Sequence, residues 1–388
     1  MIGRESVGSE RREEDGMPGI GGSTRVMVLE GPRQMAARDL PIPDIGPDEG
    51  LLRVEMAGVC GTDVKYWSGA LPVPYPVILG HEILGEIAAI GERAAARYGV
   101  GVGDRVLVEG RVPCWSCRWC RSGDHRFCRN RRGYGTRTPI TEPPGLWGAL
   151  AEYMYLAPGS MVHAIPKNVS AETATAAALL ANGIEWLELK GGATLGDRVV
   201  IQGAGPQGLA ATVVAREIGA RQIIVTGLAR DAARLDLARD LGAHHTIVAD
   251  EADVVAEVTR LTDGELADVV LDVSGSPRAI ETSVEVVRTL GTLVLGGLTG
   301  KDAVTSLKID RLVWNAIRVQ GVYVKGEVAY SKAIAFIARA ADRYPIDRIV
   351  SHRFALEDAE SAILAAAGTA PPGFVKAAVV PDGTRQST

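Results

Sequence analysis

The sequence predicts a two-domain α/β protein, in which a mostly β domain precedes a Rossmann-type domain with a doubly wound parallel sheet. Three observations support this. The 388 residues are enough for two domains that each bury a core. Near residue 184 the pattern changes to alternating apolar strands and helices, which is typical of a parallel sheet. A glycine-rich turn at 203–208 lies between such a strand and such a helix.

The first two segments differ sharply in composition. Residues 1–23 carry charge and glycine without apolar periodicity, so we predict a disordered N-terminal extension. They lack the apolar region of a signal peptide, and their acidic residues argue against a transit peptide. Residues 24–183 are predicted to form the mostly β domain, with strands at 24–29 and 53–59 separated by a proline-containing loop.

Composition excludes several classes of protein. A formal net charge of −5 gives no general attraction to nucleic acid or to anionic membranes. No apolar run is long enough to span a bilayer. Five cysteines, unevenly placed, do not make a secreted disulfide framework. We therefore expect a cytoplasmic protein without a nucleic-acid or membrane partner.

A first candidate metal site combines three residue types. His81 and Glu82 lie side by side between Gly80 and Gly85, which suits a metal held at a tight turn. Cys60 stands upstream, and a thiolate together with a neutral imidazole favours zinc. Three protein ligands with an open position are typical of catalytic zinc. The alternative is a buried cysteine, a core histidine and a surface glutamate. It would be the better interpretation if the cysteine or the histidine occurred alone.

A second candidate site lies in a lobe at residues 110–132. Its spacing, Cys-x2-Cys-x2-Cys-x7-Cys, can close four thiolates around one structural zinc, and the residues are Cys114, Cys117, Cys120 and Cys128. Two disulfides are an alternative that a reducing compartment disfavours. A nucleic-acid-binding finger, suggested by the arginines at 118–132, needs a helix that this lobe is too short to present. The fifth cysteine, Cys60, is left without a disulfide partner, and we expect two zinc ions per chain.

Residues 184–325 are predicted to form the Rossmann domain, and residues 326–388 to return to the first domain. After a strand at 197–202, Gly203 permits the turn, Gly205 lets a pyrophosphate approach the backbone, and Gly208 lets the helix pack on the strand. The phosphates would then lie at a helix N-terminus. Further elements are predicted as helices at 209–218 and 232–241 and as strands at 222–226, 268–273, 292–296 and 318–324. A glycine-rich turn of an unrelated α/β domain is the alternative, against which the two zinc sites argue.

These motifs, in this order and spacing, resemble the zinc-containing medium-chain alcohol dehydrogenases. The resemblance includes Cys60-Gly-Thr-Asp63, the glycine-flanked His81-Glu82 pair, the four-cysteine lobe and the turn at 203–208. The segment beginning at Cys60 is most similar to the sorbitol (polyol) and butanediol dehydrogenase branch. The resemblance implies a GroES-like catalytic domain, a Rossmann domain, an active site between them, NAD or NADP, and a homodimer or homotetramer.

The resemblance also implies a ligand set. Cys60 and His81 would be metal ligands, and Glu82 a direct ligand or a carboxylate just outside the metal. Many family members have Cys or Glu near the start of the inter-domain helix, but residues 180–183 (Leu-Ala-Asn-Gly) offer neither, so water or substrate takes the fourth position. By elimination Glu82 is predicted as the third ligand, with Glu185 as the next acid to test.

Four further residues take roles by the same resemblance. Thr62 resembles the hydroxyl that accepts the proton of the substrate alcohol, and Asp63 the carboxylate that orients the zinc-bound histidine. Lys65 occupies the position at which the family commonly has a His that ends the proton relay. Lys376 falls where the family tends to place a basic partner for the glutamate.

The predicted reaction is oxidation of a secondary alcohol of polyol, sugar or cyclitol type to a ketone, with hydride transfer to NAD(P). A primary-alcohol dehydrogenase or aldehyde reductase is one alternative, because it differs only in pocket shape. A catalytically silent zinc and nucleotide-binding regulator is the other, against which an open metal site argues. The candidates for lining the pocket are Tyr66, Trp67, Trp147 and Trp314.

The end of the second Rossmann strand bears on the choice of dinucleotide. NAD enzymes usually place an acid there, but Gly227 takes the position, so no carboxylate would repel a 2′-phosphate. Arg230 or Arg234 could pair with that phosphate. Alternatively both arginines are solvated, or Asp231 neutralises Arg230, and NAD binds through the backbone. We predict that NADP is usable and that any NAD preference stays below about a hundredfold in kcat/KM.

Overall fold

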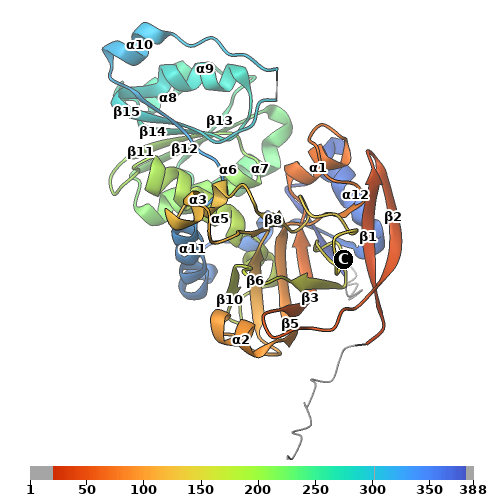
Figure 1. Ribbon diagram of the computed structural model, residues 1–388. Helices are drawn as coiled ribbons and strands as arrows, with labels where there is room; N and C mark the ends of the chain where they lie inside the picture. Colours follow the sequence, from red (N-terminus) through yellow and green to blue (C-terminus); the bar gives the residue numbers. More distant parts are fainter. Residues whose placement is uncertain (1–20, 301, 382–388) are drawn as a thin grey trace, which may run out of the picture.

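The computed structural model describes residues 21–300 and 302–381, and it confirms the predicted α/β fold. Figure 1 shows a Rossmann-type part (green to cyan) beside a β-rich part (red to yellow). The predicted N-terminal extension lies outside the described residues, apart from its last three positions. No helix in the described ranges has the length and apolar character needed to cross a membrane.

The β-rich part contains a seven-stranded sheet with the order β10-β6-β5-β3-β18-β17, in which β9 also pairs with β3. A three-stranded sheet, β2-β1-β4, packs beside it. The strands are β1 (Ser23–Gly31), β2 (Gln34–Pro41), β3 (Gly50–Gly58), β4 (Val77–Ile78), β5 (Glu82–Ile90), β6 (Arg105–Glu109), β7 (Arg111–Val112), β8 (Arg132–Gly133), β9 (Tyr153–Leu156), β10 (Val162–Ala164), β17 (His352–Ala355) and β18 (Ala377–Val380). The helices are α1 (Gly61–Trp67), α2 (Glu92–Tyr98), α3 (Arg118–Arg121), α4 (Ala171–Thr175), α5 (Ala177–Gly183) and α12 (Ala359–Leu364).

The C-terminal chain completes the β-rich part. The last strand, β18, pairs antiparallel with β3, with Ala378 opposite Gly58. In Figure 1 the blue α12 lies beside the red α1, and the two helices are in contact. The sheet therefore joins segments more than three hundred residues apart in the sequence.

The Rossmann-type part is a six-stranded parallel sheet with the order β13-β12-β11-β14-β15-β16. This is the order 3-2-1-4-5-6 of a doubly wound dinucleotide-binding sheet. The strands are β11 (Arg198–Gln202), β12 (Gln222–Gly227), β13 (His245–Val248), β14 (Ala267–Asp272), β15 (Val287–Leu295) and β16 (Arg318–Gly321). The helices are α6 (Pro206–Ile218), α7 (Ala232–Asp240), α8 (Val254–Leu261), α9 (Pro277–Val286) and α10 (Ile309–Trp314). Helix α11 (Glu327–Ala340) follows this sheet and contacts α5.

The two parts share one apolar core. Helix α5 continues without a break into the π-helical segment η2 (Ile184–Lys190), so the predicted boundary at 183/184 lies inside a continuous helical run. Helix α5 contacts both α6 and α11. The same buried cluster contains Met56 and Leu84 of the β sheet together with Val199 and Leu209 of the Rossmann-type part. The domain boundaries themselves stay a prediction.

The turn at 134–137, which follows β8 and the cysteine lobe, packs on the candidate metal-ligand loop. Gly135 has a φ of +67°, and a Cβ there would lie 2.4 Å from the carbonyl oxygen of Gly80. Gly99, which ends α2, has almost the same φ, +66°, but no atom lies within 4 Å of its Cβ position. Alanine substitutions at these two glycines therefore separate the free-energy cost of the left-handed backbone from the cost of a steric clash.

We predict that Gly99→Ala costs about 1–2 kcal/mol, the usual penalty for a left-handed L-residue. Gly135→Ala should cost roughly 1–3 kcal/mol more, because its methyl group overpacks the contact with Gly80. Urea unfolding of both variants measures the difference. Equal losses of unfolding free energy in the two variants would contradict the close packing of this turn on Gly80.

Candidate active site

The first metal cluster is assembled by neighbouring strands. Cys60 follows β3 and precedes α1, whereas His81 and Glu82 stand at the start of β5. Because Gly58 pairs directly with Glu82, the two segments are brought together. The Cys60 Sγ, a His81 ring nitrogen and a Glu82 carboxylate oxygen lie within 4.8 Å of one another.

Gly58 makes room for the carboxylate. A Cβ at Gly58 would lie only 2.2 Å from Glu82 Oε2. Glu82 is 6% exposed, so its carboxylate needs a positive partner. Lys376 Nζ lies 2.8 Å from Glu82 Oε2 and donates to the Val59 carbonyl at 2.8 Å. Burial lowers the pKa of Lys376, but the charges of Glu82 and Cys60 outweigh burial and raise its pKa overall.

Asp63 fixes the geometry of the other two ligands. Its Oδ1 lies 3.3 Å from His81 Nδ1, and its Oδ2 accepts a hydrogen bond from the Cys60 backbone N–H at 2.8 Å. With Nδ1 facing Asp63, the other ring nitrogen remains for a metal. Burial raises the pKa of the Cys60 thiol, but the hydrogen bond from His81 and the positive charges of His81 and Lys376 together lower its pKa overall. A thiolate, an imidazole and a carboxylate fit a zinc ion with one open position.

Thr62 and Lys65 lie on α1 beside this cluster. The Cys60 Sγ is 3.6 Å from Thr62 Oγ1, which places the hydroxyl next to the ligands. Lys65 is half-buried in the last turn of α1. Within the described part of the chain, its ammonium group makes no hydrogen bond and no ion pair.

The continuous helix formed by α5 and η2, called the inter-domain helix below, contributes no ligand to the metal cluster. The Asn182 amide donates to Gln207 Oε1 at 3.0 Å and accepts from the Lys325 backbone N–H at 2.8 Å. It therefore links the glycine-rich turn to the segment that follows β16. Glu185 lies outside the metal cluster. Its Oε1 is 2.5 Å from Arg126 Nη1, an ion pair that ties the cysteine lobe to this helix.

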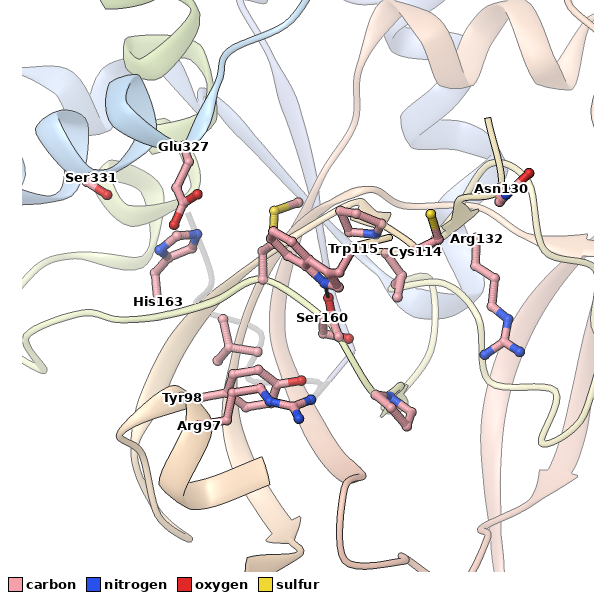
Figure 2. A pocket seen from close by; sticks show the side chains of 16 residues that line it. Arg97, Tyr98, Cys114, Trp115, Asn130, Arg132, Ser160, His163, Glu327 and Ser331 are labelled. Atoms are coloured by element: carbon pink, nitrogen blue, oxygen red, sulfur yellow. Dashed lines mark hydrogen bonds between the residues drawn. The ribbon is translucent and has the colours of Figure 1, made fainter. Parts of the chain in front are cut away.

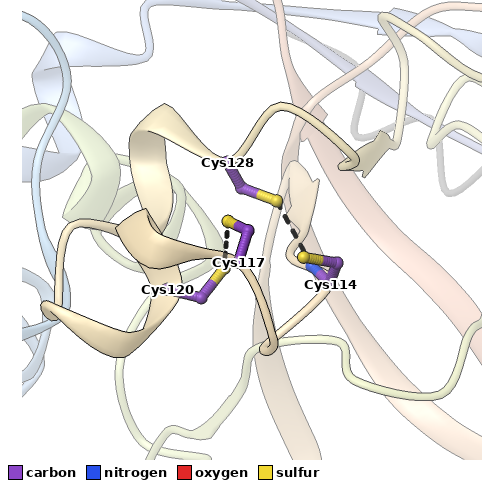
Figure 3. Close-up of side chains that lie close together, drawn as sticks. All are labelled: Cys114, Cys117, Cys120 and Cys128. Carbon is purple, nitrogen blue, oxygen red and sulfur yellow. Dashed lines mark hydrogen bonds between the residues drawn. The ribbon is translucent and has the colours of Figure 1, made fainter.

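The second cluster is the cysteine lobe. Figure 3 shows the four sulfur atoms of Cys114, Cys117, Cys120 and Cys128 turned toward one another, and they lie within 4.8 Å of one another. All five cysteines are free of disulfide bonds. The lobe presents only short helices, the four-residue α3 and a three-residue 3-10 helix at His125–Phe127. Four converging thiols without a helix long enough to read a groove fit a structural zinc site and not a nucleic-acid-binding finger.

The glycine-rich turn has the shape that a pyrophosphate requires. Gly203 has a φ of +114°, and Gly205 precedes α6 with no atom within 4 Å of its Cβ position. A Cβ at Gly208 would lie 1.9 Å from the Gly203 carbonyl oxygen. The three glycines therefore make the turn, leave open space at the N-terminus of α6, and let the helix approach the strand.

The end of β12 differs in one respect from the expectation. Gly227 is buried, and a Cβ there would lie 3.0 Å from Leu235. Asp231 pairs with Arg234 at 2.9 Å and not with Arg230, and Arg234 also donates to the Phe374 carbonyl at 3.1 Å. The suggestion that Asp231 neutralises Arg230 is therefore wrong, and Arg230 is exposed.

Two of the four candidate pocket residues lie elsewhere. Trp147 is fully buried in the core of the β-rich part, where it stacks on Tyr134. Trp314 ends α10 and is 81% exposed. The predictions that Trp147 and Trp314 line the substrate pocket were wrong. An aromatic residue in the sequence does not by itself show whether its side chain lies in the core, in a pocket or on the surface. Tyr66 and Trp67 are half-buried on α1, and the Trp67 Nε1–H donates to Glu360 at 2.8 Å.

A separate cavity of about 820 Å³ lies beside the cysteine lobe. Figure 2 shows Trp115 above Ser160, with His163 and Glu327 on one side and Arg132 on the other. Cys114 lines this cavity, but Cys60, His81 and Glu82 do not. The cavity is therefore distinct from the candidate active site.

Together the fold and the two clusters define a two-domain, zinc-type dehydrogenase. Residues 46–167 match the model of the alcohol dehydrogenase GroES-like domain, and residues 206–339 match that of the zinc-binding dehydrogenase family. A Mycobacterium tuberculosis protein named as an alcohol dehydrogenase is 39% identical over 360 residues, which cover 90% of this chain and 95% of the relative. The L-threonine 3-dehydrogenase of Rhizobium etli is 32% identical over 330 residues, with 82% and 88% covered.

Solved structures agree. An alcohol dehydrogenase from Thermotoga maritima has a TM-score of 0.85 and 28% identity, covering 93% of this chain and all of its own. A Sinorhizobium meliloti structure named as a zinc-binding dehydrogenase and bound to NADP has a TM-score of 0.83 and 27% identity, with the same coverage. The chain belongs to the zinc-containing medium-chain alcohol dehydrogenase family, and it is an oxidoreductase. Its place in the sorbitol and butanediol branch stays a prediction.

We predict that Lys376→Met destabilises the zinc-replete protein by about 3–5 kcal/mol, because it leaves the buried Glu82 carboxylate without its partner. In a Glu82→Gln background the same change should cost much less, since no buried charge then remains. Urea unfolding of the four proteins of this cycle gives the coupling.

Lys332→Met is the matched control, because Lys332 pairs with Glu188 at the surface, where an ion pair contributes below about 1 kcal/mol. A loss at Lys376 no larger than that at Lys332 would contradict the role assigned to the buried pair.

Proposed function

We propose that the chain oxidises a secondary alcohol of polyol, sugar or cyclitol type to a ketone, with NAD or NADP as the second substrate. The observation that carries this proposal is the open cluster of Cys60, His81 and Glu82 with the Thr62 hydroxyl beside it. The threonine 3-dehydrogenase relatives, whose named substrate has its hydroxyl on a secondary carbon, support the secondary alcohol. A primary alcohol remains the second candidate, because one relative is named simply as an alcohol dehydrogenase.

Each residue of the site has a distinct task. Cys60, His81 and Glu82 would hold zinc, and Asp63 keeps the His81 ring oriented. When bound, zinc supplies the Lewis acidity that lowers the pKa of a substrate hydroxyl. Thr62 would accept the proton that the hydroxyl releases, and its position 3.6 Å from Cys60 Sγ supports this role.

The proton would leave Thr62 along α1. The half-buried Lys65 stands on the same helix, where it could end the relay in place of a histidine. Such a role would require the lysine to be neutral when it accepts the proton.

The second zinc is proposed to be structural. The four thiols of the lobe can fill a tetrahedral coordination sphere completely, which leaves no position for a substrate. The Arg126–Glu185 ion pair would hold the ordered lobe in a fixed position against the inter-domain helix.

The dinucleotide is proposed to bind at Gly203, Gly205 and Gly208, where it supplies the hydride acceptor. The NADP-bound relative supports the use of NADP. Since Gly227 brings no carboxylate and Arg234 is engaged by Asp231, the exposed Arg230 is the better candidate for a 2′-phosphate.

We also propose a homodimer or homotetramer. Strand β16 is at the free edge of the six-stranded sheet. Exposed apolar side chains gather in and near it, including Val313, Trp314 and Val319. A second copy would remove these side chains and the strand edge from water.

The function is tested with the purified protein, a panel of secondary and primary alcohols, and each dinucleotide. We predict oxidation of secondary alcohols, read as nicotinamide absorbance, with kcat/KM values for NAD and NADP within about a hundredfold of each other. Metal analysis should give two zinc ions per chain. Cys60→Ser should remain folded, retain the lobe zinc and lose activity, whereas Cys117→Ser should lose stability. Full activity of Cys60→Ser, or a single zinc in the well-folded wild-type protein, would contradict the proposal.

A further inference from the structure

Three arginines gather on the hairpin that closes the cysteine lobe. Arg111 is in β7, which pairs with β8 so that Arg111 stands opposite Gly133. Arg131 immediately precedes β8, and its Nη1 donates to the Cys128 carbonyl at 2.8 Å. A Cβ at Gly133 would lie 3.4 Å from the Cβ of Arg137, which places Arg137 against the same hairpin.

This hairpin packs directly on the metal-ligand loop. A Cβ at Gly110, the residue before Arg111, would lie 2.9 Å from the Cβ of His81. Gly135, between Arg131 and Arg137, is in contact with the Gly80 backbone. The segments that carry the arginines therefore run alongside His81.

The arginines lack carboxylate partners. Across residues 21–300 and 302–381, none of the three forms an ion pair or hydrogen bond with a carboxylate. Arg111 and Arg131 are half-buried, and Arg137 is exposed. Half-buried guanidinium groups with no carboxylate beside them are costly, and a bound anion would relieve that cost.

The arginines also reach toward the Rossmann-type part. Arg111 Cζ lies 5.6 Å from the centre of the Tyr323 ring, which follows β16. Burial raises the pKa of Tyr66, Asp63 and Tyr323 raise it further, and Arg137 lowers it. Tyr66, which is on the same helix as Thr62 and Asp63, is therefore influenced by the charges of both Asp63 and Arg137.

We propose that the alcohol oxidised at this site carries an anionic group, a carboxylate or a phosphate, which Arg111, Arg131 and Arg137 bind while its hydroxyl faces the Cys60, His81 and Glu82 cluster. The guanidinium fork matches the oxygens of either anion. The proposal rests on the proposed dehydrogenase function and narrows its substrate to charged hydroxy compounds. Arg111 is a specificity-determining residue in this scheme, and the neutral polyol is the weaker substrate.

The test compares charged and neutral members of matched pairs with the zinc-replete enzyme: threonate with threitol, gluconate with sorbitol, and sorbitol phosphate with sorbitol. We expect the charged member of at least one pair to have a kcat/KM at least about tenfold higher. The carboxylate and phosphate pairs distinguish the two kinds of anion. Equal or better turnover of every neutral member would overturn the proposal and leave the dehydrogenase function intact.

Arg111→Gln should lower kcat/KM for the charged member by about 10- to 100-fold and leave the neutral member nearly unchanged. Arg111→Lys should recover part of the loss, which separates a charge effect from misfolding. Arg118→Gln is the control, because Arg118 is exposed on the same lobe and lies 4.3 Å from the Trp119 ring. If Arg111→Gln instead raises KM only for the dinucleotide, the arginines bind cofactor phosphates and the proposal is wrong.

Calorimetry decides the case in which no member of the panel is oxidised. Threonate, gluconate and sorbitol phosphate are titrated into the enzyme with NADP present. Binding that disappears in Arg111→Gln but not in Arg118→Gln would support the anion site and place the failure in the proposed reaction. Absence of binding by all three anions would overturn the anion site.

Discussion

The structure of the active site depends on one buried ion pair. Glu82 fits because Gly58 has no side chain, and its charge is tolerated because Lys376 reaches it from the far end of the chain. Strand β3 pairs with β5 on one side and with β18 on the other, so a single sheet carries all three residues. The C-terminal segment that ends in β18 therefore completes the sheet and also supplies the lysine that pairs with Glu82 at the candidate metal site.

The lobe extends this arrangement. Its four cysteines shape a compact loop, the Arg126–Glu185 pair fastens it to the inter-domain helix, and its closing hairpin lies against Gly80. A metal bound by the four thiols would therefore hold in place the segments that carry Arg111 and its neighbours. Several of the arginines at 118–132, which first suggested a nucleic-acid contact, have partners within the protein: Arg118 lies over the Trp119 ring, Arg126 pairs with Glu185 and Arg132 pairs with Glu142.

Local signals made much of this predictable. The cysteine spacing and the glycine turn are short motifs whose geometry follows from a few neighbouring residues, and both clusters form as expected. Strand β13 (His245–Val248) was missed because its sequence, His-Thr-Ile-Val, has only two apolar residues and lacks the apolar run of its neighbours. The burial of Trp147 and the exposure of Trp314 were also missed. Such features, like the contact of Glu82 with Gly58 or of Arg126 with Glu185, depend on packing between segments distant in sequence, which no local pattern encodes.

The most direct test of the account is anomalous diffraction at the zinc edge from crystals of the intact protein. The account predicts two peaks per chain. One should lie at the centre of the four lobe sulfur atoms, and the other should be bound by Cys60, His81 and Glu82 with its fourth position open to water or substrate. A second peak bound by Glu185 in place of Glu82, or no peak at Cys60 in an active crystal, would contradict the central claim.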